Sequence, residues 1–326
     1  MRVRATTVAG AVVLALGMGA LSVVGGATGM AGSGGAFVAL AAAAGPEICA
    51  VPARGGASGA LAARLSSDIL AAVAGRTDRY AVAVYDRVSG ITCQLNAAAP
   101  FDSASVVKAT ILAALLRWHQ QTGQPLSSGE RELATLMITE SDNDAATDLW
   151  NEVGSGELQG FLDLAGMTQT RLGTDGYWGL TQITAHDELT LLRLLTTANP
   201  VLSDYSRSYE LGLMARVDPS QSWGVPAGAP ADVTAHVKNG WLPDATGWHI
   251  NSIGAFTGDG RDYMIVVLTD GNPSMAYGVA TVEAVARAVH QDLGAAQPSA
   301  GPRLAVTVSP GPSPYAIVPA LPPYLQ

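Results

Sequence analysis

The chain has 326 residues, of which 48% are hydrophobic and only 14% are charged, and its net charge is -9. This length and composition are enough to bury a full core in one or two domains. The net negative charge and the lack of a run of basic residues argue against a protein that binds the phosphate backbone of nucleic acids.

The first 44 residues have the layout of a secretory signal peptide. Arg2 and Arg4 precede an apolar run over 8–24, no carboxylate occurs, and the small residues at 41–44 offer a cleavage site. Cleavage after Ala31 is an alternative. An uncleaved membrane anchor is a second alternative, although glycines interrupt the apolar run. We therefore expect a secreted protein that does not contact the membrane after cleavage.

Cys49 and Cys93 are the only cysteines of the chain. An even number in an exported protein predicts one disulfide, and a free buried thiol at Cys93 is the alternative. Neither cysteine has a spaced His or Cys partner, and the five histidines share no ligand spacing. We expect no metal ion and no cofactor.

The hydrophobic pattern predicts strands at both ends of the chain and helices in the middle. After an N-terminal segment over 45–58, it predicts, in chain order, a helix over 59–74, strands over 80–86 and 91–96, and helices over 105–121, 128–139, 144–153, 156–165, 183–198 and 205–217. Strands over 233–237, 248–257 and 262–269 and a helix over 274–293 follow. The helix over 105–121 is apolar nearly all round, so it belongs in the centre of a domain.

The simplest assembly is an α+β domain over 59–296. One antiparallel sheet, built from both ends of the sequence and flanked by the terminal helices, packs beside an all-helical subdomain as a three-layer α/β/α sandwich. Residues 297–326 contain eight of the 18 prolines and lack a helical period. We expect them to form a loose extracellular tail.

Only two of the 18 basic side chains are lysines, Lys108 and Lys238. Arginine stays protonated, whereas an amine in a dry pocket can lose its proton and act as a base. Both could also be ordinary solvated residues. Their sequence neighbours favour a role in catalysis or substrate binding, because Lys108 follows Ser105 by three positions and Lys238 precedes Gly240 by two.

Three short motifs contain the candidate site residues, and each could instead have an ordinary structural role. Ser105 and Lys108 share one face of a helix, where a lysine of lowered pKa can activate the serine hydroxyl; a capped helix with a solvated lysine is the alternative. Ser141-Asp142-Asn143 lies between two predicted helices, where such residues are common N-caps. Lys238-Asn239-Gly240 ends a predicted strand, where glycine permits close approach of a ligand or marks the strand end.

In this order the three motifs resemble those of the penicillin-recognising serine hydrolases, and the chain is most similar to the class A β-lactamase catalytic domain. The resemblance covers about residues 60 to 295. It implies that Ser105 is the acylated nucleophile, Lys108 its base or proton relay, Ser141 a proton shuttle and Asn143 a partner of Lys108 or of the substrate amide. It further implies that Lys238, Asn239 and Gly240 bind the substrate, and that the backbone N–H groups of Ser105 and Trp241 form an oxyanion hole.

The sequence departs from that family at three points. The segment between Leu172 and Thr184 resembles the family's omega loop but contains no glutamate to activate the deacylating water. Its only carboxylate, Asp175, is the candidate deacylation base. Asn239 stands where the family usually has threonine or serine, and the stretch between the first two motifs is short.

The resemblance implies a secreted, monomeric serine hydrolase that acylates Ser105 with a β-lactam or a D-Ala-D-Ala-like peptidoglycan amide, with deacylation slowed by the missing glutamate. A peptidoglycan D,D-peptidase or an esterase with the same residues is the first alternative. A non-catalytic protein that binds a cell-wall ligand is the second, and the retained Ser105 and Lys108 argue against it.

Overall fold

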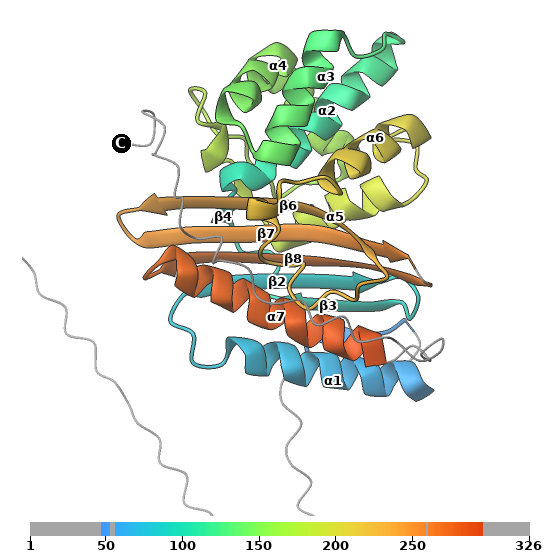
Figure 1. Ribbon diagram of the computed structural model, residues 1–326, viewed down its shortest axis with the longest axis vertical. Helices are drawn as coiled ribbons and strands as arrows, with labels where there is room; N and C mark the ends of the chain where they lie inside the picture. The colour runs from blue at the N-terminus through green and yellow to red at the C-terminus, as the bar shows by residue number, and fades with distance from the viewer. Residues whose placement is uncertain (1–46, 53–55, 259, 296–326) are drawn as a thin grey trace, which may run out of the picture. The chain divides into compact units, whose positions relative to one another are not determined.

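A six-stranded antiparallel sheet, in the order β1-β3-β2-β8-β7-β6, is the centre of the fold (Figure 1). Its strands are β1 (Cys49–Ala50), β2 (Arg79–Asp86), β3 (Ile91–Leu95), β6 (Thr234–Asp244), β7 (Gly247–Gly258) and β8 (Arg261–Asn272). The computed structural model describes residues 47–52, 56–258 and 260–295, all within one compact unit. The expected signal peptide over 1–44 and tail over 297–326 lie outside the described residues.

Helices cover both faces of the sheet, as expected for three layers. Figure 1 shows α1 (Gly56–Val73) and α7 (Met275–Ala295) on one face. The other face carries the helical subdomain, formed by α2 (Val107–Thr122), α3 (Ser128–Thr135), α4 (Asn143–Ala165), α5 (Ala185–Thr196) and α6 (Asp204–Met214). None of the described helices is both long enough and apolar enough to cross a membrane.

The alternation of side chains along the strands produces two separate cores. In β2, Ala81 and Ala83 join the core under the helical subdomain, whereas Val82 and Val84 join the core under α1 and α7. Successive residues of a strand point to opposite faces, so a strand buried on both sides reads as a continuous apolar run. The small alanines let the subdomain approach the sheet closely.

Helix α2 is buried from Val107 to Leu116 and ends at Gly123, which has a left-handed φ of 66°. This confirms the prediction of a central helix. The predicted start was less accurate: Ser105 lies in the short 3-10 helix η1 (Ala104–Val106), and the side chain of Ser103 forms no capping hydrogen bond.

Two element boundaries differ from the prediction. The helices expected over 144–153 and 156–165 form one element, α4, which is interrupted at Gly154 (φ 75°, ψ 156°). Strand β6 does not end at Val237 but continues to Asp244. The residues after Val237 include Asn, Gly and Pro, which are depleted in strands, so the sequence did not predict this continuation. An edge strand such as β6 tolerates them.

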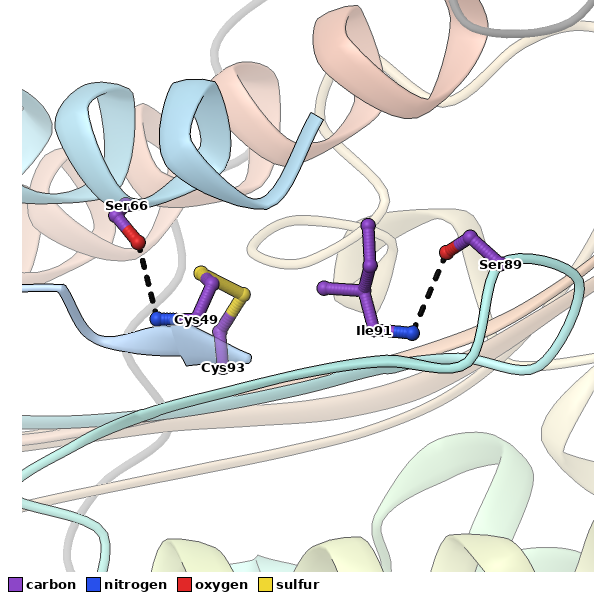
Figure 2. The surroundings of a disulfide bond; sticks show 5 residues. All are labelled: Cys49, Ser66, Ser89, Ile91 and Cys93. Carbon is purple, nitrogen blue, oxygen red and sulfur yellow. Dashed lines mark hydrogen bonds between the residues drawn. A yellow bond between two sulfur atoms is a disulfide. The ribbon is translucent and has the colours of Figure 1, made fainter. Parts of the chain in front are cut away.

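The structure contains the expected disulfide between Cys49 and Cys93. The two residues are direct partners in the pairing of β1 with β3, and the Cys49 N–H donates to Ser66 Oγ of α1 at 2.9 Å (Figure 2). The disulfide therefore joins the segment over 45–58, which precedes the expected domain, to the sheet. It lies at the sheet edge opposite β6.

Candidate active site

The segment before Ser105 is held in a strained turn. Strand β4 (Phe101–Asp102) pairs with β5 (Gln182–Ile183), and the Ser103 N–H donates to Thr181 O at 2.8 Å. Ala104 follows with a φ of 46°, which is unfavourable for a residue with a side chain. Such strain is found where the surrounding structure fixes a functional residue, and here it immediately precedes the half-buried Ser105.

Lys108 is fully buried in the first turn of α2. Its ammonium donates to Ser141 O at 2.6 Å and to Asn143 Oδ1 at 2.7 Å, with Ser141 Oγ at 3.3 Å. Burial lowers the pKa of Lys108 well below its ordinary value, the charge of Lys238 lowers it further, and Asp142 offsets part of this. Burial thus favours the neutral amine of Lys108 more than in an exposed lysine.

Ser141 is presented by an irregular junction between two helices. The π-helical turn η2 (Leu136–Glu140) ends there, and Ser141 has a left-handed φ of 58°. Asp142 then caps α4, because its side chain accepts from Ala145 N at 2.7 Å. The cap orients Asn143 toward Lys108. The expectation of a helix junction at this motif is confirmed.

Lys238 approaches the same hydroxyl from β6. It is 1% exposed and donates to Ser141 Oγ at 2.9 Å and to Asn239 O at 2.9 Å. Burial lowers its pKa to about 7. Ser141 Oγ thus receives hydrogen bonds from two buried lysines on different elements.

Gly240 is needed for close packing of β6 against the segment that contains Ser105. A Cβ on Gly240 would lie 2.8 Å from Ser103 O, from Ser105 N and from Val106 N. Its cross-strand partner Asn251 donates to Asp102 O at 2.8 Å and to Ser103 O at 3.2 Å. The short helix η1 that contains Ser105 is therefore held against both β6 and β7, and the Ser105 N–H lies against the backbone of β6.

Asn239 and Trp241 leave β6 on the opposite face. The Asn239 amide donates to Gln221 O and Trp223 O and accepts from Ser252 Oγ at 2.6 Å. The Trp241 ring packs edge-on against Trp223, with 5.7 Å between the ring centroids. Both side chains hold the loop over 221–225 rather than turning toward Lys108.

Asp175 lies in an exposed turn of the loop between α4 and α5. It has a φ of 55°, Gly176 follows with 82°, and the Tyr177 N–H donates to Thr174 O at 2.9 Å. These are the features of a tight β-turn. The structure does not bring this carboxylate into contact with the lysines and serines of the three motifs.

Trp178 is the residue of this loop that reaches the site. It is 4% exposed and its Nε1 donates to Thr147 Oγ1 at 3.1 Å, while Lys108 Nζ lies 4.9 Å from its ring centroid. The sequence analysis assigned no role to Trp178. A large aromatic residue in a polar, glycine-rich loop was the signal that could have identified it.

The structure also groups three residues that sequence spacing did not connect. Among the described residues, Asp102, Asp244 and His249 are near enough to hold a metal ion, with ligand atoms within 4.8 Å of one another. His249 Nε2 already forms a 2.9 Å hydrogen bond with Asp244 Oδ2. This bond joins the two strands of the β6–β7 hairpin, and Asp102 Oδ2 of β4 lies 3.9 Å from the same nitrogen. The cluster therefore has a structural explanation as an ion-paired contact between the hairpin and the strand that precedes Ser105.

Comparisons with known proteins agree with this geometry. The family model described as the beta-lactamase enzyme family matches residues 124–293, more than half of the chain. The match begins after Ser105 and Lys108, so it does not include the first motif. A search of curated proteins found no match.

Solved structures of class A beta-lactamases share the fold. One from Bacteroides cellulosilyticus is 18% identical with a TM-score of 0.63, and the match covers 71% of this chain and 98% of that one. One from Mycobacterium abscessus is 22% identical with a TM-score of 0.62, and the match covers 71% and 99%. A beta-lactamase from Chitinophaga pinensis is 18% identical with a TM-score of 0.64 and coverage of 70% and 99%. The chain therefore belongs to the beta-lactamase enzyme family and has the fold of the class A enzymes, in a divergent form.

Proposed function

We propose that this protein is a secreted serine hydrolase that forms an acyl-enzyme on Ser105 with β-lactams or D-Ala-D-Ala-like amides and releases it slowly. The observation that supports this proposal best is the convergence of Lys108 and Lys238 on Ser141 Oγ. Lys108 follows Ser105 by three positions. Two buried amines and a hydroxyl give a path for protons between the first, second and third motifs.

Acylation would proceed by transfer of one proton through this group. Ser105 Oγ attacks the amide carbonyl carbon, and its proton passes to neutral Lys108. The negative charge on the carbonyl oxygen is stabilised by the N–H groups of Ser105 and Trp241. The C–N bond then breaks, and Ser141 Oγ transfers its proton to the leaving nitrogen and takes up the proton held by Lys108, while Lys238 attracts the substrate carboxylate.

Hydrolysis of the ester needs a water molecule and a base on the loop side of Ser105. The loop provides no glutamate, and Asp175 lies in an exposed turn. Misplacement of a catalytic group by about 1 Å can cost on the order of a hundredfold in rate. We therefore expect acylation to be faster than deacylation. This same feature favours a peptidoglycan D,D-peptidase, which can pass the acyl group to an amine, as the second candidate.

Intact-protein mass spectrometry after incubation with a penicillin tests the proposal. The mature domain should gain the mass of one opened β-lactam, and a chromogenic cephalosporin should give a burst equal to the enzyme concentration followed by slow turnover. Ser105→Ala should gain no mass, and Ser155→Ala, at an exposed position of α4, should react like the parent. Fast hydrolysis without a burst would contradict slow release, and no adduct on the parent would favour a ligand-binding protein.

Secretion is the remaining part of the proposal. The apolar N-terminal segment and the disulfide support it. N-terminal sequencing of protein recovered from the medium should begin near Gly45 or after Ala31. Full-length protein retained with the cells would contradict it.

A further inference from the structure

The loop over 173–181 turns one large side chain inward while its neighbours stay exposed. Tyr177 is 39% exposed and Leu180 is 37% exposed, whereas Trp178 between them is 4% exposed. The loop is braced, because the Gly173 N–H donates to Thr181 Oγ1 at 3.0 Å and a Cβ on Gly173 would lie 2.1 Å from Tyr177 O. The inward direction of Trp178 is therefore fixed by the backbone of the loop.

The indole is connected to the catalytic motifs on two sides. Its Nε1 donates to Thr147 Oγ1, which in turn donates to Asn143 O at 2.9 Å. Asn143 Oδ1 accepts from Lys108, and the ring face of Trp178 lies 4.9 Å from Lys108 Nζ. One side chain thus spans the distance from the loop to the base.

The indole ring covers the Lys108 amine on the side of the loop. An aromatic ring supplies no acceptor lone pair and no base, and a well-packed ring leaves no room for a water molecule. We propose that Trp178 is a positioning residue of this site, which shields Lys108 from solvent on the loop side and keeps hydrolytic water away from the ester on Ser105. This inference rests on the proposed function and explains its slow step.

The ring has two opposing effects on the charge of Lys108. Its face attracts an ammonium group, which favours the protonated form. Its bulk removes water from the amine, which favours the neutral form. Burial is the largest cause of the lowered pKa of Lys108. Removing the ring should therefore raise the pKa of Lys108 toward its ordinary value.

The scarcity of lysine allows this effect to be measured directly. Because Lys108 and Lys238 are the only lysines, protein labelled with ¹³C at lysine Cε gives two NMR signals. Comparison with Lys238→Met identifies the Lys108 signal. Its titration reports the state of the base without any substrate, so it can fail independently of the proposed acylation.

The test compares Trp178→Ala with Trp178→Phe. The alanine variant should raise the pKa of Lys108 by about one unit or more and shorten the lifetime of the penicillin adduct by about tenfold or more. The phenylalanine variant keeps a ring but loses the indole N–H, so it should shift both measurements in the same directions as the alanine variant but by much less. Trp150→Ala removes a similarly buried tryptophan of α4 and should lower stability without moving the Lys108 titration.

Thr147→Val provides a second test if Trp178→Ala does not fold. It removes the acceptor of the indole N–H and should change the titration and the adduct lifetime in the same directions but by less. An unchanged Lys108 titration or an unchanged adduct lifetime in folded Trp178→Ala would overturn the inference. A parent protein that forms no adduct would instead refute the proposed function, and the titration would still decide the role of Trp178 in shielding Lys108.

Discussion

Lys238 and Asn239 are neighbours in β6, but their side chains serve opposite faces of the sheet. Lys238 points toward the helical subdomain and donates to Ser141 Oγ, while Asn239 points toward the α7 side and holds the loop over 221–225. The face toward the subdomain carries buried amines whose burial is costly for stability. The other face carries a satisfied hydrogen-bond network, an apolar core and the disulfide.

Alternate side chains of β6 point to opposite faces of the sheet. Those on one face lie in the candidate active site, and those on the other face stabilise the fold. Changes of the motif side chains on the subdomain face should alter acylation more than stability, and changes on the α7 face should do the reverse. The following predictions test that division.

Removal of the disulfide should give the largest loss of stability. The two cysteines are 44 residues apart, and in the chain-entropy model a loop of this length contributes about 4 kcal/mol to the free energy of unfolding. The double variant Cys49→Ala, Cys93→Ala should lose an amount of this order in chemical denaturation. The folded variant should still acylate at the parent rate, and a large loss of acylation would contradict the separation of the two faces.

Lys238→Met should have the opposite profile. Loss of one preorganised electrostatic partner costs about 3 to 4 kcal/mol in comparable sites, so the second-order rate constant for acylation should fall by about a hundredfold or more. The thermal midpoint should stay the same or rise, because an apolar side chain replaces a buried amine. Mass-spectrometric time courses and thermal melts measure both. A variant that acylates normally would remove Lys238 from the mechanism.

Asn239→Ala is the matched control one residue away. It leaves Gln221 O, Trp223 O and Ser252 Oγ without their amide partner. Loss of such buried bonds costs about 1 to 3 kcal/mol. The variant should lose stability of this order in denaturant titrations, and its acylation rate should change far less than that of Lys238→Met. An equal loss of acylation would assign Asn239 a direct part in substrate binding.

Glu188→Gln sharpens the comparison on the subdomain face. Glu188 in α5 is completely buried, and neither carboxyl oxygen has a hydrogen-bond partner among the described residues. Burial raises its pKa from 4.5 to about 8, and Asp187 adds to the shift. Between these values the folded state keeps a proton that the unfolded state loses, so stability falls as pH rises, by about 1.4 kcal/mol per pH unit.

Glutamine has no proton to lose. In Glu188→Gln the free energy of unfolding should therefore fall less steeply with pH between pH 5 and 7, by about 1.4 kcal/mol per pH unit. Denaturant titrations across this range measure it. The lysines of the site do not affect the difference between the two proteins, since both contain them. Equal slopes would show that Glu188 ionises normally in the folded protein.

The sequence by itself determined the three motifs, the layout of strands at both ends and helices in the middle, and the central helix that carries Lys108. These are local properties, because the hydrophobic period and the residue spacing can each be recognised within one continuous segment of the sequence. Lysine scarcity added a compositional signal that did not depend on the fold. The pairing of Cys49 with Cys93 also followed from the count of cysteines, and the structure contains it.

Only the tertiary structure decided which side chains of these motifs face the site. The extension of β6 past Val237 sets the alternation that turns Lys238 inward and Asn239 away. The place of Trp178 against Lys108, and the clamp of Asn251 on the segment before Ser105, join elements far apart in the chain. Such contacts depend on strand register and on the closure of loops, and neither leaves a periodic signal in the sequence.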